Sequence, residues 1–257
     1  MEKNCARTQK ETSMIRKNTQ HAITLVKRIL FHFGLIKSFV PPSGMIHFGD
    51  FNRTKPFSKK FGYDRGGPVD RYYIEGFLER ESECIRGLVM EIKDRGYTMQ
   101  FGGSKVDKSE VLDIDQGNSS ATIVADLSHA PILPDNTYDC LIVTQTLQFI
   151  YDFKDALRTC HRILKPGGTL LLTVPGITPI DKLLGDTWFW SFTNTAMKRI
   201  MEEAFPDGRV EVTSYGNVLA AAAFLYGLGR TELTTGQLDS RDPNMQVIIT
   251  VKAIKNN

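Results

Sequence analysis

Short apolar runs alternate with helix-like patterns after Arg86, and this alternation constrains the fold more than any other feature of the chain. The runs cover residues 88–92, 111–114, 122–125, 140–143, 169–174, 210–213 and 247–251. Strands buried on both faces of a sheet read as nearly continuous apolar runs, and each parallel pair needs a crossover, usually a helix. The sequence therefore predicts an α/β fold with a mostly parallel sheet and helices on both faces. With 257 residues, of which 41% are hydrophobic, the chain can bury one sizeable core.

The N-terminal 40 residues carry a different pattern. Apolar residues recur there at mostly three- and four-residue intervals, which predicts an amphipathic helix over residues 14–40. The apolar stripe consists of Ile23, Val26, Ile29, Leu30, Phe33 and Ile36, and the basic residues at other positions are Arg16, Lys17, Lys27 and Arg28. We expect residues 1–12 to be a disordered leader and Pro41-Pro42 to end the helix.

Charge narrows the range of partners. The net charge of +3 is small for this length, so no nucleic-acid partner is expected. Between Glu11 and Asp50 there is no acidic residue, so the N-terminal arm is locally positive. Two interpretations stay open for its apolar stripe. It docks on the rest of the chain or on a second copy, or else Phe31, Phe33 and Phe39 enter a membrane interface while the basic residues meet anionic headgroups. We expect docking.

Cysteine usage and hydropathy indicate a cytosolic protein whose contact with a membrane is at most peripheral. The four cysteines show no C-x-x-C spacing, and at least two lie inside apolar patterns, where a reduced thiol behaves as a small hydrophobic group. No stretch reaches the roughly 20 uninterrupted apolar residues that a membrane-spanning helix needs. No metal site is expected.

Three segments are predicted from these patterns. Residues 1–40 form the basic amphipathic arm. Residues 41–86 combine an ordered loop, rich in turn formers and aromatic residues, with a helix over 70–84, and we expect them to cover the functional site. Residues 87–257 form the α/β domain.

The most informative stretch runs from residue 126 to residue 175. It contains Asp126-Leu127, then Tyr138-Asp139 at the start of one apolar run, then Leu164-Lys165-Pro166-Gly167-Gly168 before the next. In this order and spacing the stretch resembles the class I methyltransferases that depend on S-adenosylmethionine. In that family an acidic residue ends the third strand, a Tyr/Phe-Asp pair opens the fourth, and Leu-Lys-Pro-Gly-Gly precedes the fifth. The resemblance implies a Rossmann-like sheet and S-adenosylmethionine as cofactor.

Open α/β sheets bind ligands beyond the carboxyl ends of their strands, so the strand-end residues are the candidates for cofactor binding. The resemblance places Glu91 beside the methionine end of the cofactor and Asp115 at the two ribose hydroxyls, which a carboxylate can accept together. It places Asp126 at the adenine amino group. For Asp115 and Asp126 the alternative is turn initiation or helix capping.

Three further positions complete the implied cofactor site. Leu127 offers its backbone N–H beside the adenine, and Thr144 and Gln145, which follow the fourth strand, line the floor under the methionine. The family also has a glycine-rich loop of the type E-x-G-x-G-x-G after its first strand.

This chain departs from the family in that loop. The corresponding residues are Glu91-Ile92-Lys93-Asp94-Arg95-Gly96-Tyr97, so the acid is kept while other residues replace the three glycines, and only the offset Gly96 remains. The segments before residue 111 and between residues 115 and 122 are also too short for normal crossover helices. Either residues 97–103 form a different loop that still binds the cofactor, or the domain has lost it.

The methyl acceptor is expected to bind the segment after the fifth strand. Trp188 and Trp190, beside acidic residues, suit the apolar face and hydroxyl edge of a sugar or polyol, although core packing explains them equally well. Asp186 is the candidate general base. Tyr73, together with Arg65 and Arg71, is a candidate for closing over the cofactor carboxylate, with structural ion pairing as the alternative for the arginines.

Two functions follow from this pattern. The first is an enzyme that methylates a hydroxyl of a sugar or another small hydroxylated acceptor. The second is a non-catalytic, methyltransferase-like module that serves as a partner or scaffold in glycan assembly. Residues 41–253 look like the methyltransferase-domain proteins of bacterial glycan and secondary-metabolite gene sets. The missing glycines favour the second function, whereas the retained Glu91, Asp115 and Asp126 favour the first.

Overall fold

The computed structural model describes residues 2–181 and 184–256, with side chains from Met14 onward. The chain divides into two compact units, residues 1–54 and residues 55–257. The segment predicted over residues 41–86 is therefore shared between them. Among the residues that the structure describes, every helix is too short or too polar to span a bilayer.

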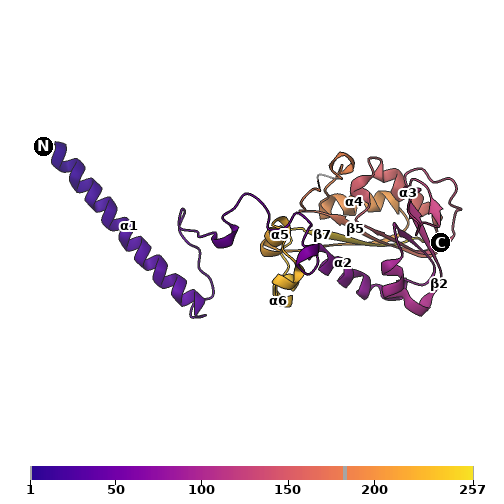
Figure 1. Cartoon of the computed structure of the whole chain (residues 1–257), viewed down its shortest axis with the longest axis horizontal. Helices are drawn as coiled ribbons and strands as arrows, with labels where there is room; N and C mark the ends of the chain where they lie inside the picture. The colour runs from indigo at the N-terminus through magenta and orange to yellow at the C-terminus, as the bar shows by residue number, and fades with distance from the viewer. Residues whose placement is uncertain (1, 182–183, 257) are drawn as a thin grey trace. The chain divides into compact units, whose positions relative to one another are not determined.

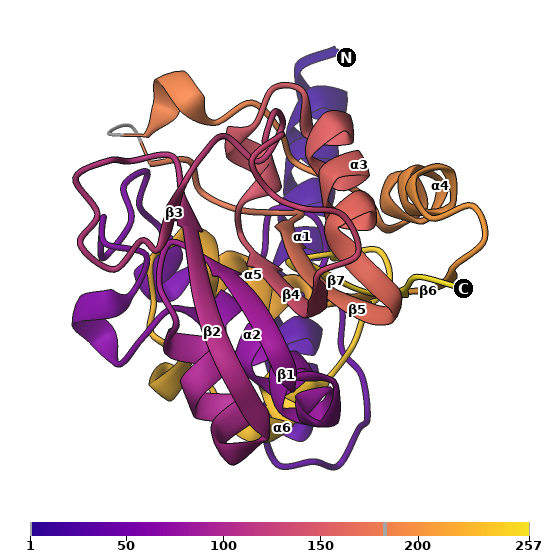
Figure 2. The same cartoon turned by 90° about the vertical axis from the view of Figure 1, so that its right-hand side faces the viewer.

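The larger unit contains a seven-stranded sheet in the order β3-β2-β1-β4-β5-β7-β6 (Figures 1 and 2). Its strands are β1 (Gly87–Ile92), β2 (Val106–Asp113), β3 (Ile123–Val124), β4 (Tyr138–Thr144), β5 (Leu164–Pro175), β6 (Arg209–Tyr215) and β7 (Ile248–Ile254). β7 runs antiparallel to both of its neighbours, and all other pairs are parallel. The predicted mostly parallel sheet is confirmed.

Helices cover both faces of this sheet. On one face α3 (Phe153–Ile163) and α4 (Asn194–Ala204) pack against one apolar core. On the other face α2 (Val69–Arg80), α5 (Val218–Leu225) and α6 (Thr235–Asp239) pack against a second core (Figure 1). The remaining helical turns are η1 (Gly49–Phe51), η2 (Tyr63–Arg65), η3 (Ser82–Cys84), η4 (Thr98–Gly102), η5 (Gly103–Lys105), η6 (Leu147–Phe149), η7 (Gly185–Thr187) and η8 (Arg230–Glu232).

The first two crossovers are as short as the sequence predicts. β1 reaches β2 through η4 and η5, which are single turns, and β2 reaches β3 through a loop without a helix. The shortness matters because these crossovers border the carboxyl ends of β1 and β2, where a ligand of an open α/β sheet binds.

The smaller unit is built on α1 (Glu2–His32). Two predictions about this helix are wrong. It begins at Glu2, within the stretch expected to be disordered, and it ends well before Pro41-Pro42. Gly34, at φ 68°, stops it, because the Leu35 N–H donates to the Leu30 carbonyl (2.8 Å) and the Gly34 N–H donates to the Phe31 carbonyl (3.0 Å). This pair of hydrogen bonds is the Schellman arrangement, which favours glycine at the left-handed position.

The Tyr138-Asp139 and Lys165 motif residues meet at the amino edge of the sheet. The Asp139 carboxylate accepts the Leu88 N–H of β1 (2.8 Å) and a hydrogen bond to each oxygen from the Lys165 ammonium (2.8 Å). Burial alone would raise the pKa of the Asp139 carboxyl, but these donors hold it below its usual range. The motif therefore ties β1, β4 and β5 together.

We predict that Gly87→Ala destabilises the protein more than Gly167→Ala. Both glycines have a left-handed backbone, at φ 67° and 79°, but only at Gly87 would a Cβ lie 2.5 Å from an Asp139 carboxylate oxygen. In both variants an alanine must adopt the left-handed conformation, which costs about 1 to 2 kcal/mol. We expect Gly87→Ala to lower the free energy of unfolding by roughly 2 to 4 kcal/mol, because the Asp139 contacts must shift as well. Urea denaturation measures both variants, and equal losses would contradict the role given to Asp139.

Candidate functional site

The strand order reverses between β1 and β4, which lie side by side in the middle of the sheet. At such a switch point the connections leave the two strands in opposite directions, so a crevice opens outside their carboxyl ends, and open α/β sheets bind ligands there. Of the described non-glycine residues with a left-handed backbone, Lys93 (φ 77°) directly follows β1 and Gln145 (φ 48°) directly follows β4. Strained backbone of this kind clusters at functional sites.

Lys93 stands at the first glycine position of the family's loop. Its backbone keeps the left-handed conformation that a glycine adopts without strain. Gly96 starts the helical turn that follows, since its N–H donates to the Asp94 carboxylate (2.7 Å). The turn of the loop is therefore retained although its glycines are replaced.

Glu91 anchors the loop after β1 by hydrogen bonds. Its buried carboxylate accepts hydrogen bonds from the Tyr97 N–H (3.2 Å), the Thr98 N–H (2.7 Å) and the Thr98 hydroxyl (2.7 Å). Burial raises the pKa of the Glu91 carboxyl to about 6. The loop's own donors surround the carboxylate, and the expected position of Glu91 beside the methionine stays a prediction.

The end of β2 differs from the prediction by one residue. The strand ends at Asp113, and Asp115 lies in the following turn, where one carboxylate oxygen accepts the Gly117 N–H (2.8 Å). Asp113, which the sequence reasoning missed, is the acidic residue at the strand end itself. The Asn118 amide donates to the Asp113 carboxylate (2.6 Å) and to the Lys93 carbonyl (2.6 Å), so this side chain joins the ends of β1 and β2.

Asp126 and Leu127 follow β3. One Asp126 oxygen accepts the Ser128 N–H (2.8 Å) and hydroxyl (2.7 Å), which makes Asp126 a turn initiator. The Leu127 side chain is buried in the core and fixes the backbone at this position. Both residues stay predictions as adenine contacts.

Polar atoms without partners gather after β4 and at the end of β5. Gln145 Nε2, Gln148 Oε1 and Thr173 Oγ1 are buried and have no hydrogen-bond partner among the described residues. Thr144 pairs with Thr173 across the two strands, and the Gln145 N–H donates to the Thr173 carbonyl (2.9 Å). Buried polar groups normally find a partner in the protein, in water or in a ligand. Sequence reasoning missed Gln148 because it looks like a surface residue of a turn.

The aromatic segment after β5 packs on the turn after β4. The Trp188 ring contacts Phe149 edge to face at 5.0 Å, and the Trp190 ring contacts Phe153 at 5.3 Å. Both indole N–H groups donate to backbone carbonyls, that of Trp188 to Trp190 (3.2 Å) and that of Trp190 to Ile150 (3.1 Å). These contacts agree with the packing alternative. Asp186, in η7, is exposed.

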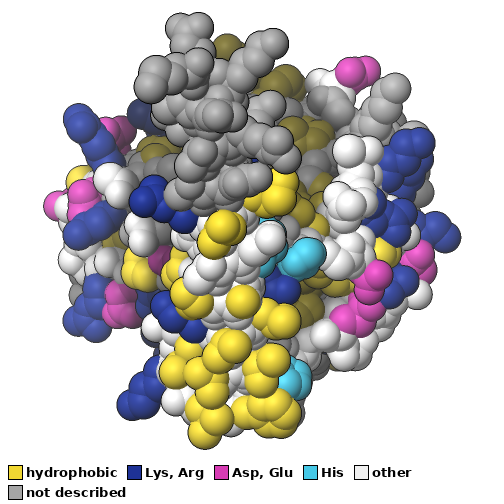
Figure 3. Space-filling model, turned by 90° about the vertical axis from the view of Figure 1, so that its left-hand side faces the viewer, with side chains coloured by type: hydrophobic (Ala, Val, Ile, Leu, Met, Phe, Trp, Pro, Cys, Tyr) yellow, Lys and Arg dark blue, Asp and Glu magenta, His cyan; other side chains and the backbone are white. Residues whose placement is uncertain are grey.

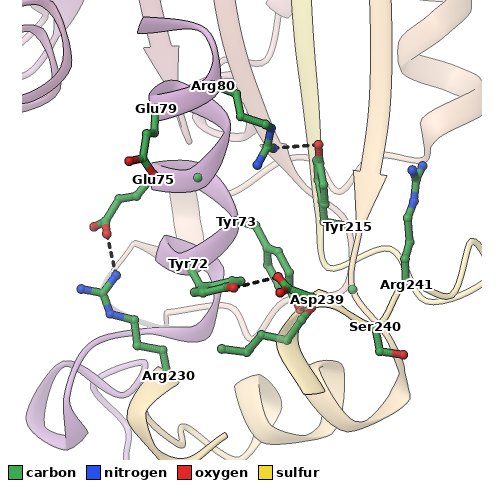
Figure 4. A pocket seen from close by; sticks show the side chains of 13 residues that line it. Tyr72, Tyr73, Glu75, Glu79, Arg80, Tyr215, Arg230, Asp239, Ser240 and Arg241 are labelled. Carbon is green, nitrogen blue, oxygen red and sulfur yellow. Dashed lines mark hydrogen bonds and ion pairs between the residues drawn. The ribbon is translucent and has the colours of Figure 1, made fainter. Parts of the chain in front are cut away.

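The structure gives Tyr73 packing contacts, and its predicted place at the cofactor carboxylate stays untested. Its buried hydroxyl donates to the Leu238 carbonyl (3.0 Å), and its ring stacks on Tyr215 of β6 with centroids 5.9 Å apart. Tyr73 lines a pocket of about 500 Å³ between α2, β6 and α6 (Figure 4). β6 lies four strands from β1, roughly 19 Å at the usual strand spacing. The phenol therefore packs away from the β1–β4 crevice.

Arg65 and Arg71, the two arginines predicted together with Tyr73, lie in different places. Arg65 forms an ion pair with Glu232, which ties residues 55–68 to the β6–β7 connection. Arg71 donates to the Tyr97 hydroxyl (2.8 Å) in the loop after β1. Of the residues expected to close over the cofactor carboxylate, Arg71 alone lies beside the crevice loop.

We predict that Glu91 makes stability depend on pH. Its folded-state pKa of about 6 lies above the ordinary value of 4.5, so the folded protein holds this proton more tightly than the unfolded chain does. The protonated Glu91 carboxyl contributes about 2 kcal/mol to the free energy of unfolding, in full below about pH 4.5, and this contribution is lost as pH rises through 6. Between these pH values the free energy of unfolding, measured by denaturation, should fall for the native protein relative to that of Glu91→Gln, which cannot titrate. Parallel pH profiles would contradict the assignment.

Comparison with known proteins agrees with this geometry. Residues 100–172 match the family model described as a methyltransferase domain. Ubiquinone/menaquinone biosynthesis C-methyltransferases are similar over short stretches: the one from Ectopseudomonas mendocina is 34% identical over 103 residues, 39% of this chain and 40% of that protein. The one from Pasteurella multocida is 42% identical over 62 residues, 23% of this chain and 22% of that protein. The chain thus spans less than half the length of these curated relatives.

A solved structure is similar over a larger part of the chain. The S-adenosylmethionine-dependent methyltransferase from Mesorhizobium loti aligns with a TM-score of 0.50 at 16% identity and covers 74% of this chain and 99% of that one. At this identity the likeness concerns the fold alone, whereas the matched motifs of residues 100–172 concern the sequence. Residues 100–172 thus match a methyltransferase domain, and the larger unit has the fold of S-adenosylmethionine-dependent methyltransferases.

Proposed function

We propose that this protein is a methyltransferase that binds S-adenosylmethionine in the crevice between the carboxyl ends of β1 and β4. The observation that carries the proposal is the buried, unpartnered set of polar atoms at Gln145, Gln148 and Thr173, next to a strained backbone at Gln145. Such atoms are stabilised when a ligand or water supplies their partners. Gln145 and Gln148 follow β4, one of the two strands of the switch point, and Thr173 lies on the neighbouring β5.

The residues around the crevice fit the parts of this cofactor. Carboxylates at the end of β2, on Asp113 and Asp115, suit the two ribose hydroxyls, and Asp126 with the Leu127 N–H suits the adenine edge. Thr144 and Gln145 floor the methionine end, and Arg71 beside Tyr97 suits its carboxylate. When bound, the sulfonium supplies an activated methyl group. The protein's contribution is to hold an acceptor in line with that group, since alignment accounts for most of the rate in such a displacement.

For the acceptor we propose a sugar or another small hydroxylated molecule, with Asp186 as the general base. The support is chemical: an exposed carboxylate in η7 precedes Trp188, whose ring offers an apolar surface. The curated relatives are named as C-methyltransferases. Nuclear magnetic resonance of a methylated product distinguishes an oxygen-bound from a carbon-bound methyl group.

One observation favours the second function, a non-catalytic module. Both Asp113 oxygens already accept hydrogen bonds inside the protein, from the Asp115 N–H (3.1 Å) and from the Asn118 amide (2.6 Å). A ribose at this carboxylate must share or displace these donors. Ligand binding therefore separates the two functions.

We predict that S-adenosylhomocysteine, the demethylated product, stabilises the protein. A ligand that binds only the folded state adds about 2.7 kcal/mol at a hundredfold excess over its dissociation constant. Thermal unfolding and titration calorimetry measure this directly. An unchanged melting temperature at millimolar ligand, with no heat of binding, would reject the enzyme and leave the scaffold function.

If binding is observed, Asp115→Ala should weaken it by roughly 1.5 to 3 kcal/mol, because the change removes hydrogen bonds to a charged acceptor. The matched control is Asp107→Ala, which removes an exposed carboxylate near the opposite end of the same strand and should leave the affinity unchanged. Asp113→Asn completes the series. If Asp113→Asn weakens binding and Asp115→Ala does not, the ribose contacts the strand end, and the predicted residue is wrong.

A further inference from the structure

The N-terminal helix exposes one apolar face. Met14, Ile15, Leu25, Val26 and Ile29 are 47 to 66% exposed, and at 3.6 residues per turn they fall on one half of α1. Figure 3 shows hydrophobic side chains gathered along the described part of this helix. A helix with such a stripe is stable in water only if another apolar surface covers the stripe.

The chain's own continuation packs along one edge of this face. Thr24 is buried, and it lines a groove with Ile15, Ile23, Phe39 and Pro42. The Arg28 guanidinium donates to the Met45 carbonyl (3.1 Å). Residues 39–45 therefore fold back along the edge of the face that Ile15 and Ile23 mark, whereas Met14, Leu25, Val26 and Ile29 stay exposed.

Charge identifies the partner of this face. Arg16, Lys17, Lys27, Arg28 and Lys37 lie in the same segment as this face, and no acidic residue lies between Glu11 and Asp50. In a dimer through the arms, these five cations of one copy would face five of the other with no carboxylate in the same segment to neutralise them. An anionic lipid surface supplies an apolar interior for the stripe and negative headgroups for the cations.

We propose that α1 lies in the interface of an anionic membrane, with its apolar face toward the acyl chains and its basic residues at the headgroups. This inference rests on the N-terminal unit alone. It therefore stands or falls separately from methyl transfer by the β1–β4 crevice.

The test is sedimentation of the full-length protein with vesicles. The protein should bind vesicles that contain phosphatidylglycerol and not vesicles of phosphatidylcholine alone. Binding should fall steeply when salt rises from about 0.1 to about 1 M, because the screening length shrinks from about 10 to about 3 Å. Equal binding to both vesicles, or no binding at low salt, would overturn the proposal.

Two matched pairs of variants locate the contact. Val26→Asp with Ile29→Asp places two charges in the apolar face, and its control, Ile132→Asp with Ile180→Asp, places two charges at exposed isoleucines elsewhere. Lys17→Glu with Lys27→Glu reverses two charges of the arm, and its control is Lys59→Glu with Lys198→Glu, both exposed. Each basic residue near an anionic surface contributes about 1 kcal/mol, a fivefold change, so the arm pair should lower partitioning at least about 25-fold.

The controls should bind as the native protein does, and neither arm variant should change the melting temperature. A lowered melting temperature in the Val26 and Ile29 variant, without vesicle binding by the native protein, would instead assign the face to docking on residues 55–257. Concentration-dependent dimers lost in the same variant would assign it to a second copy. Either result overturns the membrane assignment.

Discussion

The Asp139 carboxylate connects three neighbouring strands, and the position of the proposed cofactor crevice depends on this connection. It accepts the Leu88 N–H of β1 and binds the Lys165 ammonium of β5, while Asp139 itself belongs to β4. Hydrogen bonds to a charged group are stronger than neutral ones, and this carboxylate is partly shielded from water. Since the three strands run parallel, fixing their amino ends in register also fixes where their carboxyl ends lie.

At the carboxyl ends of β1 and β2, where the connections have no long helix, side chains hold the loops that follow the strands. Glu91 gathers the donors of Tyr97 and Thr98 under the loop after β1. Asn118 joins the Lys93 carbonyl to the Asp113 carboxylate across β1 and β2. These hydrogen bonds hold the loop after β1 although its connection is short, with Lys93 in the left-handed conformation that favours glycine.

The strands were predictable because their apolar runs are buried on both faces, which leaves a signal in every residue of the run. Strand ends were less predictable. Ile114 looks like a continuation of β2, but its side chain is 69% exposed, and the strand ends one residue earlier at Asp113. Sequence alone does not show which of two alternating acids faces the crevice, because that depends on the register with the neighbouring strand.

The remaining differences between prediction and structure concern Tyr73, the end of α1 and Gln148. A tyrosine in a loop-and-helix segment is a plausible ligand contact, yet the Tyr73 hydroxyl donates to the carbonyl of Leu238. That residue is far along the chain and is brought near by the β6–β7 connection. The end of α1 had a local signal in Gly34, which Pro41-Pro42 obscured. Gln148 became a candidate only once its side chain was found buried with an oxygen that lacks a partner.

Hydrogen–deuterium exchange with and without S-adenosylhomocysteine tests the central claim most directly, because it locates the ligand on the chain. The account predicts slower exchange in residues 92–98, 113–118 and 144–149, which follow β1, β2 and β4. It predicts no change in residues 72–80 and 209–216, which line the pocket at β6. Protection confined to the β6 pocket, or no protection where calorimetry shows binding, would contradict a cofactor site at the β1–β4 switch point.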